Sequence, residues 1–412
     1  MAVLLLVVAG QAAGQQRWKP IAVPWTDSSA LKPDSSNFVT ASFIVISPGE
    51  EIYSNLGHAT LRMECPSYKL NYCFSFETDI KPEDFLRFFA GEANGHIVAV
   101  PTGEFLAPYK QEGRQVKQYV LNLTPHEKQE LWRMLDNDMV SDERRKFNFL
   151  ANNCVSISFG MVEDCLIEEH IDYVWPQCMT LDNGDYVRYL MKKSPWMRFL
   201  SITLLGTESD VTWDNHDRLA PSVLIPIEQK SRIVGLDGTS RPVLTGKSLE
   251  LLPLRHQLSP ASKASPMVVF GCLFLLVLII TVLEWKPGLK RPARITDAVL
   301  LAVQTLVGLL LIYMSCVASL FGTHWNWYLI PFNPLPALIW LIGRRRAHFG
   351  KVYLLYTVVL VLFILATPLS SQLDWEHQLV TATLALRTAS CYLAYRRQRQ
   401  AAHPHPHHKH RG

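Results

Sequence analysis

The sequence predicts an α+β domain exported from the cytoplasm and, after it, an all-α domain with several membrane spans. Three observations support this prediction. Residues 15–260 combine charged residues with strand-like and helix-like patterns, whereas residues 267–395 consist mainly of apolar runs. Lys and Arg flank these runs in alternate loops. The first residues form a short apolar run followed by small residues, a pattern typical of an export signal.

The N-terminal segment is the first element of this division. Residues 1–14 resemble the hydrophobic core and cleavage site of a secretory signal, although they lack the usual basic residues before the core. A buried N-terminal strand is the alternative interpretation. The exported domain is expected to span residues 15–194, and residues 17–36, rich in Pro, Ser and Asp, form its leading arm.

Strands dominate the first half of the exported domain. Pro66-Ser67 forms a tight turn between two strand-like segments, so these two strands should pair antiparallel. Residues 82–90 have the pattern of a short amphipathic helix, and Thr124 caps a second helix that runs to about residue 137. The segments expected to be strands are 37–47, 59–65, 68–77, 96–101 and 115–123.

A polar turn then opens into a helix with a cysteine in its first turn. Asn153 is a good N-cap residue, because its side-chain oxygen accepts an N–H group at the start of a helix. Cys154 therefore lies at the positive end of the helix dipole, which favours the thiolate. Asn152 or Asn153, with free backbone N–H groups, are candidates for stabilising an oxyanion; the alternative role of Asn153 is a helix cap only. The helix should run to about residue 168.

A thiol nucleophile needs a base within hydrogen-bond reach and a group that orients that base. His58 is the best candidate base, because it follows Gly57 at the start of a strand. Counting back from the turn at Pro66 places Ser75 roughly opposite His58, with Glu77 close by, so both are candidates for the orienting group. The histidines that compete with His58 are His96, His126 and His170.

Five of the eight cysteines lie in the exported domain, where an oxidising compartment permits disulfides. Cys65 and Cys73 flank the tight turn, and Cys165 and Cys178 flank the end of the Cys154 helix. If these two pairs form disulfides, Cys154 is the unpaired thiol. The alternative is that all five are free and buried. No metal and no other cofactor are predicted, although the histidine-rich tail contains potential metal ligands.

Five apolar segments follow a linker predicted at residues 195–266. Each is close to the roughly 17–25 residues that a helix needs to cross a bilayer. The positive-inside rule orients the first span from outside to inside, which leaves the first domain outside the cytoplasm. The net charge of +4 comes from the flanking residues and from the basic tail, 396–412, so it indicates topology rather than nucleic-acid binding. The predicted spans are 267–284, 297–320, 327–343, 352–370 and 378–395.

Several of these features together resemble a known family. Gly57-His58-Ala59, the run from Phe147 to Cys154 that ends in Asn-Asn-Cys, and the membrane-spanning region are similar to the lipoprotein N-acyltransferase family called Lnb. Further similarities are Arg114, Tyr119, the stretch containing Gly206, Asp210 and Pro221, the loop His324-Trp325-Asn326 and the following Asn333-Pro334-Leu335. The resemblance implies a circularly permuted papain-like (NlpC/P60-like) exported domain, in which the histidine precedes the cysteine.

The same resemblance implies a function. Such an enzyme transfers a fatty acyl chain from a membrane phospholipid, through an acyl thioester on Cys154, to the α-amino group of the diacylglyceryl-modified N-terminal cysteine of a lipoprotein. It would lie in the inner (cytoplasmic) membrane as a multi-pass protein, with the catalytic domain on the periplasmic side. His324 and Asn326 would then be candidate contacts to a lipid headgroup; interfacial anchoring by Trp325 and Trp327 is the alternative.

Two other functions remain open on the same residues. A membrane-anchored cysteine peptidase or amidase acting on cell-wall peptides would also use Cys154 and His58, but with a polar groove for a peptide in place of an acyl tunnel. An exported binding domain would need Cys154 only as a buried structural residue. Five spans favour the acyltransferase, because an anchor needs fewer.

Overall fold

The computed structural model describes residues 39–49, 54–79, 87, 90–148, 152–212, 214–255, 264–286, 290–318, 322–343 and 349–402. These residues divide into two compact units. Unit 1 holds residues up to 194 together with 211–261, and unit 2 holds 195–210 together with most of the chain after 262. The predicted signal, the leading arm, most of the helix predicted at 82–90 and the histidine-rich end of the tail lie outside the described residues.

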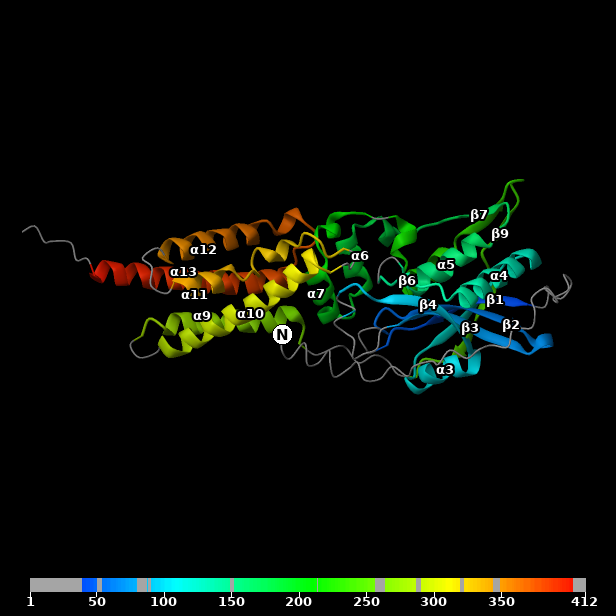
Figure 1. Cartoon of the computed structure of the whole chain (residues 1–412), viewed down its shortest axis with the longest axis horizontal. Coiled ribbons are helices and arrows are strands. Elements are labelled where there is room, and N and C mark those ends of the chain that lie inside the picture. The colour runs from blue at the N-terminus through cyan, green and yellow to red at the C-terminus, as the bar shows by residue number, and fades with distance from the viewer. Residues whose placement is uncertain are drawn as a thin grey trace, which may run out of the picture. The chain divides into compact units, whose positions relative to one another are not determined.

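Unit 1 is built around an antiparallel sheet of seven strands (Figure 1). The strand order is β10-β5-β1-β2-β3-β4-β6, so the strands from β1 to β4 are neighbours in sequence and in space. Each of the five segments predicted to be strands forms one. The strands are β1 (Thr40–Ile46), β2 (His58–Cys65), β3 (Leu70–Thr78), β4 (Asn94–Pro101), β5 (Val116–Leu121), β6 (Arg145–Lys146) and β10 (Leu244–Leu252).

Two helices cover one face of this sheet (Figure 1). α4 (Pro125–Ser141) begins at the predicted Thr124 cap, which forms a complete capping box with Glu127. α5 (Cys154–Asp164) begins at the predicted Asn153 cap and ends about one turn earlier than expected. Both helices pack on the larger of the two apolar cores that flank the sheet. The first turn of α5 therefore lies against the central strands of the sheet.

Helix α3 (Thr102–Gln111) covers the opposite face and was not predicted. Gly103 and Pro108 lower the helix propensity of this segment. Phe105 is nevertheless fully buried in the second core, beside Ile44 on β1. Most of a helix's stability in a protein comes from such packing rather than from propensity, which explains why local pattern missed it.

The β2–β3 hairpin has the expected turn but lacks the expected disulfide. Cys65 pairs with Leu70, whereas Cys73 pairs with Arg62 further along the ladder. Because side chains alternate between the faces of a strand, the two sulfur atoms lie on opposite faces of the sheet. Cys65, Cys73, Cys165 and Cys178 are all free and buried, so both predicted disulfides are wrong and the alternative of free thiols holds.

The segment predicted to be a linker contains ordered elements. α8 (Pro221–Glu228) and β10 belong to unit 1, whereas α7 (Pro195–Leu204) belongs to unit 2. Among the prolines and glycines that suggested a linker, Pro221 starts α8, whereas Pro226 lies inside α8 and Gly246 inside β10. Gly238 has a φ of +82° in the turn that follows β8. A small antiparallel sheet contains β7 (Glu169–Asp172), β8 (Arg232–Gly235) and β9 (Ser240–Pro242).

Unit 2 is helical. α9 (Pro266–Leu283) and α10 (Lys290–Cys316) are each long and apolar enough to cross a membrane. α12 (Phe349–Leu365) is apolar but shorter, and α13 (Trp375–Ala402) is long but carries several charges. These helices correspond in order to the first, second, fourth and fifth predicted spans.

The third predicted span is a short helix preceded by a non-helical loop. α11 (Leu335–Gly343) has 9 residues, or about 14 Å, which is roughly half of a bilayer core. Pro331 and Pro334 prevent an earlier start, because proline cannot donate to a helix. The free carbonyl of Pro331 accepts hydrogen bonds from the Gln304 amide and the Tyr356 hydroxyl, both at 2.9 Å. These two side chains therefore satisfy the backbone that the break exposes.

A buried ion pair network explains the arginine in the fifth predicted span. Arg387 on α13 donates to both carboxylate oxygens of Asp297 on α10, at 2.7 and 3.0 Å. It also donates to Glu284, the residue after α9, at 2.7 Å. Three helices are thus joined through one guanidinium, and the pairing makes the buried charge tolerable.

Candidate active site

His58 begins β2 directly after a turn that requires glycine. Gly57 has a φ of +86°, and a Cβ added there would lie 2.7 Å from the carbonyl oxygen of Ile46. The ladder pairs His58 with the same Ile46 on β1. The turn therefore fixes the position of the His58 imidazole at the start of β2.

His58, Ser75 and Glu77 form a hydrogen-bonded chain on one face of the sheet. Nε2 of His58 lies 2.8 Å from the Ser75 hydroxyl oxygen, and this hydroxyl donates to Oε1 of Glu77 at 2.6 Å. The direct distance from His58 Nε2 to Glu77 Oε1 is 3.8 Å. Continuing the observed β2–β3 register places Glu77 opposite His58, with Ser75 two residues along the same face.

This chain assigns the tautomer of His58. A serine hydroxyl has one proton to donate, and the Ser75 proton points to Glu77. Ser75 must therefore accept a hydrogen bond from Nε2–H of His58. Nδ1 is then the unprotonated nitrogen and the one able to accept a proton.

Asn153 caps α5 with its whole side chain. Its Oδ1 accepts from the N–H groups of Val155 and Ser156 at 2.8 and 3.1 Å, and its Nδ2 donates to the carbonyl of Leu219 at 2.8 Å. These contacts match the helix-cap alternative, because they use both polar atoms of the side chain. Asn152 is exposed and precedes the cap.

The Cys154 thiol lies beside the backbone of the strand that carries His58. Among the groups that stabilise its thiolate is the backbone N–H of Ala59, the residue after His58, with the amides of Cys154 and Val155 contributing less. No hydrogen bond joins Cys154 to the His58 ring among the described residues. Such bonds are often long until substrate binds.

Burial keeps both groups neutral in this structure. Burial lowers the pKa of His58 to about 3, with a smaller contribution from the Arg114 guanidinium. Burial also raises the pKa of the Cys154 thiol to about 12, against the opposing effect of the Ala59 amide. Burial raises the pKa of Glu77 too. The expectation that the helix start makes Cys154 a thiolate is therefore wrong here, because desolvation outweighs the helix dipole.

Three further side chains form a row that begins at His58. The ring of Phe105 lies 6.2 Å from the imidazole, Tyr109 packs edge-on to Phe105 at 5.3 Å, and the Arg114 guanidinium stacks on Tyr109 at 5.0 Å. Arg114 also donates from Nε to the carbonyl of Ser47 at 2.8 Å, which anchors the chain just after β1. Local sequence pattern does not point to Phe105 and Tyr109, because it does not predict α3.

The competing histidines are less well placed. His126 and His170 are exposed, on α4 and β7. His96 lies on β4, where it pairs with Glu77 of β3, so β3 separates it from β2. α5 contacts β2 and β3, so His58 is the histidine on a strand that the Cys154 helix touches.

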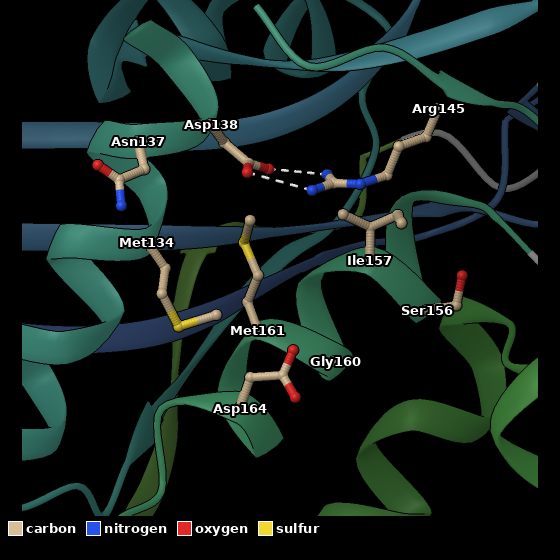
Figure 2. Close-up of a pocket in the computed structure, with 9 residues that line it drawn as sticks. All are labelled: Met134, Asn137, Asp138, Arg145, Ser156, Ile157, Gly160, Met161 and Asp164. Carbon is tan, nitrogen blue, oxygen red and sulfur yellow. Dashed lines mark hydrogen bonds and ion pairs between the residues drawn. The ribbon is translucent and has the colours of Figure 1, made fainter. Parts of the chain in front are cut away.

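A separate cavity lies beside α5. It has a volume of about 290 Å³ and is lined by α4, α5 and Arg145 (Figure 2). Figure 2 shows the bidentate ion pair between Asp138 and Arg145 along one side, with a shortest distance of 2.7 Å. Neither Cys154 nor His58 lines this cavity. The candidate catalytic groups are therefore identified by their polar contacts and not by a large pocket.

The two candidate lipid contacts of unit 2 differ from each other. His324 is exposed and its Nδ1 lies 3.0 Å from the carbonyl oxygen of Ser315. Asn326 is 4% exposed. Its Nδ2 donates to the carbonyl of Thr203 at 2.7 Å, and its Oδ1 accepts a hydrogen bond from the Gln372 amide at 2.8 Å. Asn326 is thus part of the internal packing, whereas His324 remains able to meet a ligand. Trp325 is 82% exposed, as interfacial anchoring requires.

Two family models match this chain. The model of the Lnb N-terminal periplasmic domain matches residues 27–189. The model of the Lnb transmembrane domain matches residues 259–398. The chain belongs to the Lnb family. No curated protein and no solved structure matches it.

Membership of the Lnb family confirms the resemblance found in the sequence. This Lnb protein is associated with a membrane and has a periplasmic N-terminal domain, and its α+β sheet domain is followed by a helical part. Family membership also points to an enzyme. Within the described ranges, no group of three or more His, Cys, Asp or Glu side chains is arranged to hold a metal ion.

Proposed function

We propose that this Lnb protein is a lipoprotein N-acyltransferase that uses Cys154 as nucleophile and His58 as general base. The hydrogen-bonded chain from His58 through Ser75 to Glu77, next to a cysteine at a helix start, carries the proposal. It supplies the three parts that a thiol acyltransferase needs: a nucleophile, a base and a group that orients the base. The transmembrane domain supports a substrate that is itself in the membrane.

The first half-reaction forms an acyl thioester. Nδ1 of His58 takes the thiol proton as Sγ of Cys154 attacks the ester carbonyl carbon of a phospholipid, and a C–S bond forms. Backbone amides beside the sulfur, those of Ala59 and Cys154, stabilise the oxyanion. The C–O bond then breaks, His58 gives its proton to the leaving oxygen, and lysophospholipid departs.

The second half-reaction transfers the acyl chain to the lipoprotein. The α-amino nitrogen of the diacylglyceryl-modified cysteine attacks the thioester, a C–N bond forms and the C–S bond breaks. His58 moves a proton from the amine to the sulfur, which restores the thiol. Ser75 and Glu77 hold the imidazole in one tautomer through both steps and stabilise the imidazolium. A papain-like fold in circularly permuted order would place the same groups in the same sequence order.

Labelled phospholipid tests this function directly. The full chain is incubated with phospholipid carrying a labelled acyl chain, and a hydroxylamine-sensitive label on Cys154 is measured. We expect label on the wild type, none on Cys154→Ala and a rate lower by about 10²–10⁴-fold for His58→Ala. Cys272→Ala, which removes an exposed thiol on α9, is the matched control and keeps the label.

Two outcomes separate the proposal from its alternatives. Adding a diacylglyceryl-modified peptide should move the label into a hydroxylamine-stable amide on that peptide. A folded protein that never acquires acyl label contradicts the acyltransferase. Cleavage of cell-wall peptides that depends on Cys154, without acyl transfer, would instead establish the membrane-anchored peptidase or amidase.

A further inference from the structure

Helix α3 brings a tyrosine hydroxyl to the candidate active site. Tyr109 follows Phe105 by four residues on α3, so both rings lie on the same side of that helix. The Phe105 ring lies 6.2 Å from the His58 imidazole and 5.3 Å from the Tyr109 ring. Phe105 is fully buried, whereas Tyr109 is partly exposed. Of these two rings, Tyr109 is therefore the one that a substrate can reach.

The Tyr109 hydroxyl has hydrogen-bonding capacity that the protein does not use. Within the described ranges it makes no hydrogen bond. A tyrosine hydroxyl that packs into a protein usually has a partner, so one without a partner calls for an explanation. Burial, and after it the Glu77 carboxyl, raises the pKa of Tyr109 well above its usual value. At neutral pH the group is therefore a protonated hydroxyl and able to donate a hydrogen bond.

The groups within electrostatic range of this hydroxyl include the proposed nucleophile. They are Glu77, Arg114, Cys154 and Glu112. Glu77 is the last member of the chain that orients the imidazole, and Cys154 carries the thiol. The Tyr109 hydroxyl thus lies among the groups of the proposed reaction and not on a remote part of α3.

Arg114 holds the Tyr109 ring in place and adds a positive charge. Its guanidinium lies 5.0 Å from the centroid of the ring. The guanidinium is itself fixed, because Nε donates to the carbonyl of Ser47 at 2.8 Å and Nη1 pairs with Glu112 at 3.2 Å. Arg114 is 6% exposed, so salt screens its charge only weakly. A donor that is fixed beforehand stabilises an oxyanion well, because it needs no reorganisation during the reaction.

The asparagines at the start of α5 leave the position of a side-chain oxyanion donor open. Both polar atoms of the Asn153 side chain are used, in the helix cap and by the carbonyl of Leu219. Asn152 is exposed and precedes the cap. The amides of Ala59 and Cys154 lie beside the sulfur, but they belong to the backbone. A side-chain donor must therefore come from another element.

We propose that the Tyr109 hydroxyl donates a hydrogen bond to the oxyanion that forms when Cys154 attacks an acyl carbon. This inference rests on the proposed acyl transfer through Cys154 and adds a catalytic residue to it. As the C–S bond forms, the π electron pair of the carbonyl moves to its oxygen, and the Tyr109 O–H donates to this oxygen without losing its proton. When the intermediate collapses, the C=O bond forms again, the ester C–O bond breaks and the leaving oxygen takes the proton from His58.

The same oxyanion forms when the lipoprotein amine attacks the thioester. The carbonyl oxygen again takes the π electron pair as the C–N bond forms, and it returns the pair when the C–S bond breaks. Tyr109 therefore acts in both half-reactions, whereas a residue that binds a lipid headgroup would act only in the first. This difference makes the role measurable.

Tyr109→Phe removes the donor and keeps the ring. Full-length protein in detergent is acylated with acyl-labelled phospholipid or with p-nitrophenyl octanoate, an ester that lacks a headgroup. Discharge of the isolated acyl-enzyme to a diacylglyceryl-modified peptide is measured separately. Each of the three single-turnover rate constants should fall about 10²-fold, as expected for the loss of one oxyanion donor. The lipid concentration for half-maximal rate should stay the same.

Alkylation of Cys154 by iodoacetamide separates this role from an effect on the thiol or on His58. Alkylation displaces iodide from a tetrahedral carbon and forms no oxyanion, so Tyr109→Phe should react at the wild-type rate. An unchanged alkylation rate also shows that the variant is folded around the thiol.

The matched control is Tyr72→Phe. Tyr72 is a partly exposed tyrosine on β3, five residues before Glu77, which is about 17 Å along the strand. The variant removes the same hydroxyl group from the same domain at a distance from the thiol. All of its rate constants should equal those of the wild type.

The outcomes distinguish this inference from the function on which it rests. Acylation by Tyr109→Phe within about threefold of wild type overturns the oxyanion role, and so does an equal slowing of alkylation. Slowing with phospholipid alone also overturns it, since the hydroxyl would then contact the headgroup. A wild type that takes an acyl group from the octanoate ester but never from phospholipid contradicts the acyltransferase, while a 10²-fold effect of Tyr109→Phe on the octanoate reaction still supports the oxyanion role.

Discussion

The protonation of Cys154 and His58 determines how the first bond can form. Burial opposes charge on both groups, so the resting pair is a neutral thiol and a neutral imidazole. Proton transfer must then accompany attack, because the neutral thiol is a poor nucleophile. We propose that a bound substrate excludes water and brings the carbonyl, Sγ of Cys154 and Nδ1 of His58 together.

Alkylation of Cys154 should depend steeply on pH. The thiol pKa is raised to about 12, so the thiolate fraction grows as pH rises and has not levelled off by pH 9. The rate constant with iodoacetamide should increase about tenfold per pH unit between pH 6 and 9. A rate that is flat from pH 6 to 8 would show a preformed thiolate–imidazolium pair and contradict this assignment. Cys154→Ala supplies the background rate.

The Ser75 hydroxyl should matter for rate through His58. Ser75→Ala removes the link between the imidazole and Glu77 and frees the ring to change tautomer. We expect the rate of acyl-adduct formation to fall by about 10–100-fold, with little change in the lipid concentration for half-maximal rate.

Ser42→Ala is the control for Ser75→Ala. Ser42 is also a fully buried serine on the sheet, and its hydroxyl accepts from Gln118 at 2.9 Å. Its loss should cost stability but leave the single-turnover rate unchanged. Equal rates for wild type and Ser75→Ala would remove Ser75 from the mechanism.

The starts of helices and strands position the candidate catalytic groups. β2 starts at His58, α5 starts at Cys154, and α8 starts beside Gly57, where Pro221 lies 3.4 Å from the position of an added Cβ. α3 brings Phe105 and Tyr109 to the same end of the sheet from the other face. The reactive groups thus stand where strand and helix starts converge, which leaves backbone N–H groups available.

Gly57→Ala should lower the activity more than it lowers the stability of the protein. Residue 57 has a positive φ, and a Cβ there would lie 2.7 Å from the Ile46 carbonyl oxygen. The turn must therefore shift, and His58 moves with it. We expect a stability loss of about 1–3 kcal/mol by thermal denaturation and acyl-adduct formation at the level of His58→Ala.

Gly103→Ala tests whether any glycine replacement has this effect. A Cβ added to Gly103 on α3 meets nothing within 4 Å, and alanine is the better helix residue. Activity should persist and stability should rise slightly. Wild-type activity in Gly57→Ala would show that the turn does not position the base.

At the scale of the molecule, the proposed reaction uses both the periplasmic and the transmembrane domain. A thiol enzyme acting on lipid gains from being held at the membrane where both substrates are anchored. The helical unit has features of a structured bundle and not of a simple anchor: a broken third segment, and charges on α9, α10 and α13 joined through Arg387. We propose that it is multi-pass in the inner membrane.

Topology can be tested with single cysteines in a background without other reactive thiols. Leu369→Cys, in the exposed segment after α12, should react with a membrane-impermeant maleimide in spheroplasts, because that loop lies on the periplasmic side in the proposed orientation. Lys290→Cys, at the start of α10, should react only after permeabilisation. The reverse pattern would invert the membrane orientation.

Several features could be predicted from the sequence alone because they depend on local order. Alternation predicted the strands, Thr124 and Asn153 were recognisable helix caps, and apolar length with flanking Arg and Lys indicated the membrane segments. The turn at Pro66 also sets the hairpin register, so counting residues back from it is enough to bring Ser75 and Glu77 next to His58. The short motifs around His58 and Cys154 led to the Lnb family.

Tertiary structure decided what depends on packing between distant segments. Burial, which no local pattern records, made Cys154 a neutral thiol, and strand register placed Cys65 and Cys73 on opposite faces of the sheet. Helix α3 forms because Phe105 packs in a buried apolar core, despite a glycine and a proline in the segment. The aromatic cluster of Phe159, Tyr173, Trp175 and His216 unites α5, the segment after β7 and a 3-10 turn, which are far apart in the chain. Such clusters arise from contacts that close long loops, so only the folded molecule reveals them.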